Sequence, residues 1–102
     1  MKAGQNVLSH MIPAGAESAW ARLQDEAARS PVVVPCAGYG WRLWHSEDDE
    51  EQAAAARACL DCPVMVLCDA YASTAGERWG VWGGVTEKDR RRAQRRAQEM
   101  TA

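Results

Sequence analysis

The sequence predicts a small all-α protein, a bundle of about four short helices with a glycine-rich turn before the last one. A chain of 102 residues makes one small domain with a modest apolar core. Four segments carry helical spacing or residues typical of helix ends, and proline- or glycine-rich stretches separate them. Because the chain has no Phe and many alanines, its five Trp and two Tyr must supply much of the core or of an interface.

The first helix is predicted over residues 13–29. Trp20, Leu23 and Ala27 recur there at helical spacing, and acidic residues lie near the start of the segment. Pro31 follows at once, and the residue before a proline is disfavoured in helical conformation. The helix is therefore expected to stop at residue 29.

A linker, a loop and a second helix are predicted next. Residues 31–35 are bounded by prolines and too short for more than an extended linker, which places Cys36 on a loop. Residues 37–44 mix glycine with aromatic residues, as an irregular loop does when its side chains pack on a neighbour. Ser46 is the expected N-cap of the second helix, because five acidic residues follow it where the helix dipole favours negative charge. This helix is expected to run to about Cys59.

The third helix is predicted to begin at Pro63, a position where the missing N–H costs nothing. Asp61 or Cys62 would cap it, and Gly76 would end it. The apolar residues at helical spacing that form its buried stripe are Val64, Leu67, Tyr71 and Ala75.

A turn and a fourth helix complete the chain. Residues 80–84 contain three glycines in five positions, which permits positive φ or very close backbone approach. Thr86, with Asp89 three residues later, predicts the start of a last helix that continues to near Glu99.

Charge divides the chain unevenly. Residues 86–102 hold six Lys or Arg against three acidic residues, whereas residues 1–85 hold six basic and eleven acidic residues. An acidic body with a basic tail makes the tail a candidate nucleic-acid contact. We therefore divide the chain into a loose arm over residues 1–12, a helical domain over 13–85 that includes the turn, and the basic C-terminal helix over 86–102.

The chain shows no membrane or secretory signal. No stretch approaches the roughly 18 apolar residues of a membrane span, and the N-terminus lacks the apolar run of a signal peptide. We expect a cytoplasmic protein that is monomeric by itself. In a reducing compartment, four cysteines indicate metal or redox chemistry more often than two disulfides.

The four cysteines are separated by 22, two and five residues: Cys36, Cys59, Cys62 and Cys68. The last two lie about 9 Å apart along a helix at 1.5 Å per residue, and the first must close the site from a distant loop. An iron–sulfur cluster tolerates such irregular geometry better than a single tetrahedral ion does, and structural zinc usually uses two close pairs. Spacing alone leaves an iron–sulfur cluster, zinc, and a disulfide or free thiols open. His10 and His45 stand alone and are not expected to be ligands.

One family combines these features. A single Cys, then Cys-x-x-Cys-Pro-Val with a fourth Cys six residues after the third, then Gly-Val-Trp-Gly-Gly and a basic C-terminal segment resembles the WhiB-like family. The resemblance runs from about Trp20 to Arg96. Its specificity comes from the combination, because neither the cysteine spacing nor the glycine-rich segment alone would be specific.

The resemblance implies an all-helical fold wrapped around one 4Fe–4S cluster that is sensitive to oxygen and nitric oxide, with the four cysteines as ligands. It implies a transcription regulator that binds the C-terminal domain of the primary sigma factor, in RNA polymerase holoenzyme, and contacts promoter DNA. The residues implied at the sigma-factor interface are Gly80, Val81, Trp82, Gly83 and Gly84, together with Trp44 of the loop after the first cysteine.

The implied DNA contacts lie on the last helix. They are Lys88, Arg91, Arg92, Arg95 and Arg96, which share one helix face, whereas Arg90 lies outside it. Taken alone, this face is more typical of a solvated basic helix than of a DNA contact. The promoter context implied by the resemblance favours phosphate contact.

The five tryptophans are predicted to lie in different environments. Trp82 is predicted to leave an aromatic edge exposed as an interface anchor, and Trp79 is predicted to pack in the core. Three others are predicted to pack around the first helix and the cysteine site and to shield it from solvent: Trp20, Trp41 and Trp44.

The sequence therefore favours a non-enzymatic regulator in which a cluster anchors several elements, so that its loss changes docking or DNA binding. Two alternatives remain open at this stage. One is a disulfide reductase whose cluster-free form cycles Cys59 and Cys62 through a disulfide. The other is a zinc-stabilised adaptor that binds a protein and no DNA.

Overall fold

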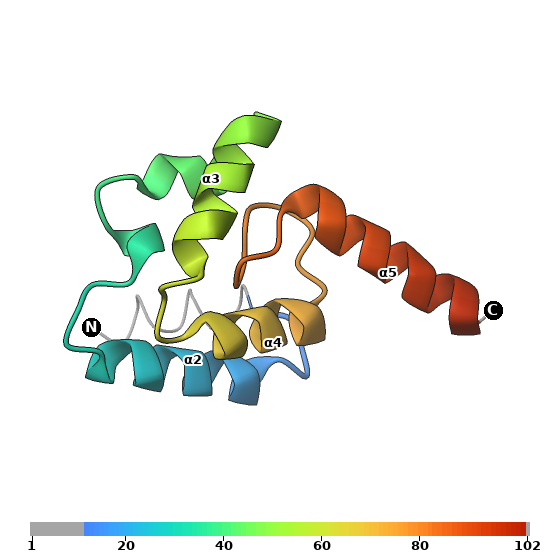
Figure 1. The fold of residues 1–102 in the computed structure, drawn as a ribbon. Coiled ribbons are helices and arrows are strands. Elements are labelled where there is room, and N and C mark those ends of the chain that lie inside the picture. The colour runs from blue at the N-terminus through green and yellow to red at the C-terminus, as the bar shows by residue number, and fades with distance from the viewer. Residues whose placement is uncertain (1–11, 102) are drawn as a thin grey trace.

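The computed structural model describes residues 12–101 and is built from helices (Figure 1). The elements in chain order are α2 (Glu17–Arg29), the 3₁₀ turns η1 (Pro35–Ala37) and η2 (Trp41–His45), α3 (Asp49–Cys59), α4 (Met65–Ala75) and α5 (Glu87–Thr101). Within residues 12–101 there is no strand, only one isolated bridge between Trp82 and Val85. The all-α prediction is confirmed. The predicted arm over residues 1–12 lies outside the described residues except for its last position.

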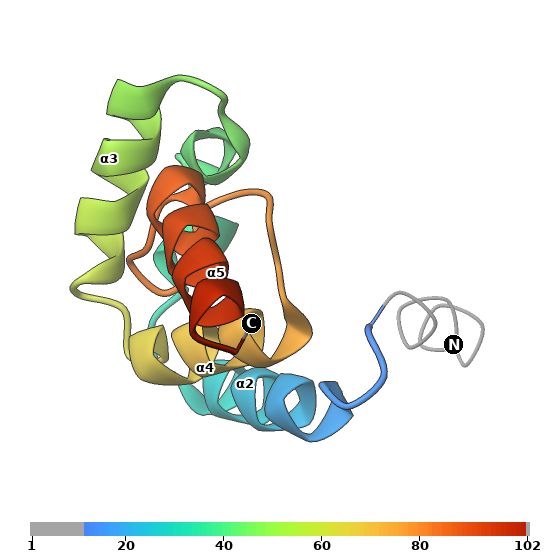
Figure 2. The same ribbon diagram turned by 90° about the vertical axis from the view of Figure 1, so that its right-hand side faces the viewer.

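The helices form a body from which the last helix projects. α2 and α4 lie side by side, and α3 packs against η1 and η2 (Figure 1). α5 leaves this body after the turn at residues 80–84, and Figure 2 shows it nearly end-on. The molecule consequently measures 42 × 31 × 21 Å. No helix in the described part of the chain has the length and apolar character needed to cross a membrane.

α2 begins four residues later than predicted. Gly15 adopts a φ of +92°, and its N–H donates to the Glu17 carboxylate at 2.9 Å. The Ala16 N–H closes a turn on the Pro13 carbonyl at 3.1 Å. Residues 13–16 therefore form a turn before the helix, because a left-handed residue interrupts the helical path. The end of α2 at Arg29 is confirmed.

α3 ends at Cys59 as predicted, but its cap differs. The Asp48 carboxylate accepts from the Glu51 N–H at 2.9 Å, which makes Asp48 the N-cap. Ser46, the predicted cap, lies two residues earlier, where its hydroxyl accepts from the Asp48 N–H at 3.0 Å. The carboxylate of Asp48, within the acidic run, therefore takes the place predicted for the Ser46 hydroxyl.

α4 begins at Met65, two residues after the predicted start. The Cys62 N–H donates to the Cys59 carbonyl at 2.9 Å, and the Met65 N–H donates to the Cys62 carbonyl at 3.2 Å. Two consecutive turns thus join α3 to α4, and Pro63 lies in the second of them. Gly76 ends α4 with a φ of +70°, as predicted.

The buried side chains fall into two small clusters. The first joins α2 to α4 through Leu23, Val64 and Tyr71, and the second joins η2 to α3 through Trp44 and Ala55. No large side chain among the described residues is fully buried. Each cluster alone is a modest source of stability, because stabilisation by burial scales with the apolar area removed from water.

Tyr71 is the central aromatic residue of the first cluster. Its ring lies between Trp20 and Trp82, at centroid distances of 5.1 and 5.3 Å, and only 3% of the residue is exposed. Its hydroxyl donates to Glu77 Oε2 at 3.0 Å. Burial, and then the hydrogen bond and negative charge of Glu77, raise the pKa of Tyr71 to about 12. The folded state therefore favours the neutral phenol.

The variant Tyr71→Phe tests whether the preference of the folded state for a neutral Tyr71 phenol stabilises the protein. An unfolded tyrosine ionises near its ordinary pKa of 10.0, so the contribution is complete below that pH and is lost as the pH rises towards about 12. The difference in unfolding free energy between wild type and Tyr71→Phe should therefore shrink over this range in urea titrations. A difference that stays constant with pH would contradict the assignment.

Candidate metal centre

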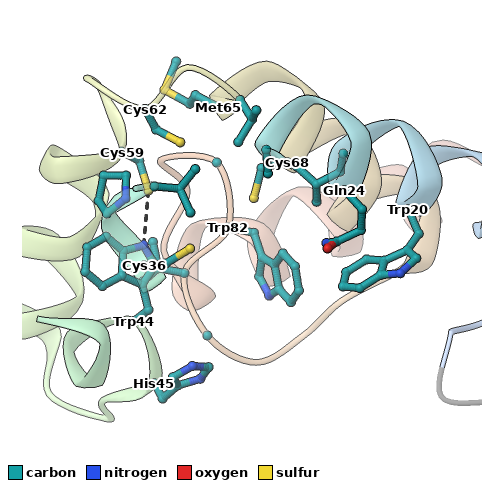
Figure 3. A pocket seen from close by; sticks show the side chains of 18 of the residues that line it. Trp20, Gln24, Cys36, Trp44, His45, Cys59, Cys62, Met65, Cys68 and Trp82 are labelled. Atoms are coloured by element: carbon teal, nitrogen blue, oxygen red, sulfur yellow. Dashed lines mark hydrogen bonds between the residues drawn. The ribbon is translucent and has the colours of Figure 1, made fainter. Parts of the chain in front are cut away.

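Four cysteines from different elements line one cavity of about 230 Å³ (Figure 3). Cys36 lies in η1, Cys59 ends α3, Cys62 lies in the turn after it, and Cys68 lies in α4. The sequence analysis expects Cys36 to reach the site from a distant loop, and the structure brings it to the same cavity as the other three although 22 residues separate it from the next cysteine. We call this space the cysteine cavity.

The thiols of the cavity are unfavourable places for isolated negative charge. Burial raises the pKa of Cys68 to about 12, and repulsion from the other three thiolates adds to the effect. Burial also raises the pKa of Cys36, again with repulsion from Cys62 and Cys59. Four thiolates can share this space only with a compensating cation, which is the usual condition of a metal centre.

Two hydrogen-bond donors point to sulfur atoms in the cavity. Trp44 Nε1 donates to Cys59 Sγ at 3.3 Å, a contact drawn as the dashed line in Figure 3. A backbone hydrogen bond from Gly83 to Cys68 acts against the burial that raises the pKa of this thiol. Such donors stabilise thiolate ligands and tune the centre that they hold.

The cavity walls are mostly apolar and come from both buried clusters. Cys62 and Cys68 pack against the cluster of Leu23 and Tyr71, whereas Cys59 belongs to the cluster of Trp44. Figure 3 shows Trp82 beside Cys68 and Trp44 beneath Cys59. The cysteine cavity therefore lies where the two clusters meet.

The size of the cysteine cavity bears on what the four thiols could hold. Among residues 12–101, no three His, Cys, Asp or Glu side chains come close enough together to hold a single metal ion. The cavity volume is many times that of the roughly 10–15 Å³ needed for one water-sized probe. A cavity of this size, with four thiols on its walls, has room for a multi-atom cluster.

The turn at residues 80–84, predicted from its glycines, is held against this centre. The Val81 N–H donates to the Trp44 carbonyl at 2.9 Å, and paired backbone hydrogen bonds of 3.0 and 3.1 Å join Trp82 to Val85. Gly83 adopts a φ of +57°, and a Cβ there would lie 2.5 Å from the Asp69 backbone nitrogen. We call these five residues the glycine turn; only glycine fits its closest approach to α4.

A buried arginine fixes the turn and the last helix together. Arg90 is 5% exposed, and its guanidinium donates to the Asp69 carboxylate at 2.7 Å, the Trp82 carbonyl at 2.9 Å and the Ser73 hydroxyl at 3.1 Å. The sequence placed Arg90 outside the basic face of its helix, and this is confirmed. It did not indicate that Arg90 is buried; the Asp69 partner, 21 residues away, leaves no local signal.

The family model described as "Transcription factor WhiB" matches residues 24–93, which include all four cysteines and the glycine turn. The chain belongs to the WhiB family. No solved structure matches the chain significantly.

Curated relatives of the chain are named transcriptional regulators. The chain is 36% identical, over 65% of each sequence, to the transcriptional regulator WhiD of Streptomyces coelicolor. It is 44% identical to the transcriptional regulator WhiB of the same organism, over 42% of this chain and 49% of that protein. It is 33% identical to the redox-responsive transcriptional regulator WhiB3 of Mycolicibacterium smegmatis, over 47% of this chain and 56% of that protein. The chain therefore spans between about half and two thirds of these relatives.

The residues expected at the sigma-factor interface differ in exposure. Gly80 and Val81 are buried, whereas Trp82, Gly83 and Gly84 are half-buried. Trp44 is only 5% exposed because its indole packs against Cys59. Trp44 therefore has little surface for a direct partner contact, and the structure gives it an internal role instead.

Two predictions for the tryptophans were wrong. Trp79 is 69% exposed, because it lies outside both apolar clusters. Its ring is in contact with the Arg91 guanidinium, whose central carbon lies 4.2 Å from the ring centroid. Trp41 is 48% exposed and contacts His45 and Arg42 of its own short turn, so it does not shield the cysteine cavity. Trp20 and Trp44 do line the cavity, as predicted.

The basic face of the last helix is mostly open to solvent. Four of the five predicted residues are exposed: Lys88, Arg92, Arg95 and Arg96. Arg91 is only half exposed, because it stacks on Trp79 and its Nε donates to the Arg78 carbonyl at 3.1 Å. Arg92 pairs with Asp89 at 3.3 Å, an exposed contact that is screened by salt.

Replacing Gly83 by Ala should destabilise the protein by more than about 2 kcal/mol, because the new methyl group would meet backbone atoms of α4 and φ is positive. Urea unfolding of the intact chain measures this cost. Gly38→Ala is the matched control, since Gly38 has a negative φ and its Cβ would contact only the Pro35 carbonyl at 3.4 Å. Equal costs for the two variants would refute the close approach.

Proposed function

We propose that this chain regulates transcription as a 4Fe–4S protein whose glycine turn docks on the C-terminal domain of the primary sigma factor and whose last helix contacts promoter DNA. The relatives described above are named transcriptional regulators, and one of them is named redox-responsive. The observation that carries the proposal is the set of contacts that joins the cysteine cavity to the glycine turn.

The donor set supports an iron–sulfur cluster held by the four cysteines. Burial and repulsion between the thiolates raise the pKa values of Cys36 and Cys68, so ionised ligands there favour a cationic core, and the cavity that all four cysteines line has room for a cluster. When bound, such a cluster would supply redox chemistry and reactivity towards oxygen or nitric oxide. The protein's own part is to exclude water with Trp20 and Trp44 and to donate hydrogen bonds to sulfur.

The turn is linked to the cysteines by two routes. One route runs from Cys59 through the Trp44 indole to the Trp44 carbonyl, which accepts the Val81 N–H. The other is the close approach of Gly83 to the backbone of Asp69, the residue after Cys68 on α4. Displacement of either cysteine would therefore move the turn, so a surface formed there would respond to the state of the centre. Trp82, half-buried at its apex, is the aromatic anchor in this proposal.

Protein purified without oxygen should contain iron and sulfide, with a broad absorbance near about 400–420 nm expected of an iron–sulfur cluster. Substituting Cys36 by Ser should reduce the iron content, since this ligand alone comes from the η1 turn. Metal analysis, sulfide analysis and absorption spectra measure these outcomes. Protein with stoichiometric zinc and no sulfide would refute the cluster and favour the adaptor function.

Trp82→Ala should lower the yield of the sigma-factor domain in co-purification at least tenfold, a loss of about 1.4 kcal/mol or more and typical of a hot spot. Met100→Ala is the matched control, because it removes an exposed apolar side chain at the far end of α5. Circular dichroism verifies that both variants are folded. Unchanged capture by Trp82→Ala would refute docking through the turn.

A further inference from the structure

The segment before the glycine turn and the last helix enclose a second hollow, distinct from the cysteine cavity. Its volume is about 480 Å³, and it is lined by Gly76, Arg78, Arg91, Gln94, Arg95, Ala97 and Gln98. Three arginines and two glutamines line it, and no acidic residue does. We call it the arginine hollow.

The arginine hollow is built by fixed contacts. The Gln94 side chain donates to the Glu77 carbonyl at 2.9 Å, and Arg91 Nε donates to the Arg78 carbonyl at 3.1 Å. These bonds hold the 76–79 segment against the middle of α5. Trp79 supports the Arg91 guanidinium from below, at 4.2 Å, within the range of a cation–π contact.

Two of the arginines remain available to a ligand. Arg78 and Arg95 are exposed, and within residues 12–101 neither forms an ion pair with an acidic side chain. Arg91, by contrast, is engaged by Trp79 and lies 3.7 Å from Glu87. Arg91 therefore helps to hold the 76–79 segment against α5, whereas the guanidinium groups of Arg78 and Arg95 are available to bind an anion.

The neighbouring hollow on the same helix has a different character. Lys88, Arg91 and Arg95 line it together with Glu47, Asp49 and Glu87. Acidic walls repel a polyanion, so this side of α5 is the poorer phosphate site. The charge distribution directs a phosphate backbone to the arginine hollow.

We propose that the arginine hollow binds the phosphate backbone of duplex DNA, with Arg78 and Arg95 as its direct contacts. The inference rests on the proposed DNA contact and extends it from one helix to a two-sided site that includes the loop residue Arg78. The guanidinium groups of Arg78 and Arg95, one from each wall, would bind phosphates of one DNA strand. Such contacts fix the position of the protein on the duplex but do not read its base sequence.

The test measures binding of the intact protein to a short duplex of mixed sequence by fluorescence anisotropy at several salt concentrations. Arg78→Gln with Arg95→Gln should weaken binding by about tenfold per lost contact near about 0.1 M salt, and should lower the salt slope by about 2. The matched control is Arg22→Gln with Arg57→Gln, which removes two exposed charges from α2 and α3.

A second variant separates this proposal from the proposed function. It replaces Lys88, Arg92 and Arg96, which lie on α5 and do not line the arginine hollow. If this variant loses DNA affinity and the Arg78/Arg95 variant binds like its control, the arginine hollow is not the phosphate site. The proposed DNA contact of α5 is then supported. If neither variant changes affinity, both proposals are refuted.

The sigma-factor domain provides the last comparison. If the Arg78/Arg95 variant binds DNA like its control but no longer captures the sigma-factor domain, the hollow faces a protein partner and the DNA assignment is overturned. Loss of DNA affinity with capture unchanged supports the proposal.

Discussion

The fold depends on one constraint: four cysteines must meet in a cavity between two small apolar clusters. Neither cluster contains a fully buried large side chain in the described part of the chain, and their members come from different pairs of elements. The cavity is where α3, α4 and η1 come together. A group bound by all four cysteines would therefore join the two clusters into one unit, and its binding energy would be folding energy.

The glycine turn depends on the same constraint. It approaches α4 so closely that Gly83 has no room for a Cβ, and its Val81 N–H donates a backbone hydrogen bond to the Trp44 carbonyl of η2. Arg90 then ties the carbonyl of Trp82 to Asp69, the residue after a cysteine of the cavity. The cysteine site, the turn and the base of the last helix are thus one connected set of contacts.

Local signals predicted most of the secondary structure. The end of α3, the glycine stop after α4 and the position of the glycine turn follow from residues near them in sequence, and all three are confirmed. Helix starts were less predictable, because Asp48 caps α3 in place of the predicted Ser46 and Gly15 interrupts the approach to α2.

Long-range contacts left weaker signals. The four cysteines were identified from spacing and resemblance, but the hydrogen bond from Trp44 and the burial of Arg90 depend on partners 15 and 21 residues away. Trp79 was placed in the core because tryptophan is usually buried. Its actual partner is the Arg91 guanidinium of α5, a contact between two elements that no local sequence pattern describes.

The attachment of α5 has a mechanical consequence. Its bonds to the body are confined to its first half: Glu87 accepts from Gly80 and its N–H donates to Gln52, Arg90 reaches α4, and Gln94 holds the segment before the turn. The helix has 15 residues and so extends about 22 Å. A tilt of about 10° at its base would move its tip by about 4 Å over such a length. The helix is therefore a lever whose pivot lies beside the cysteines, and small shifts at the pivot are enlarged where the basic side chains are.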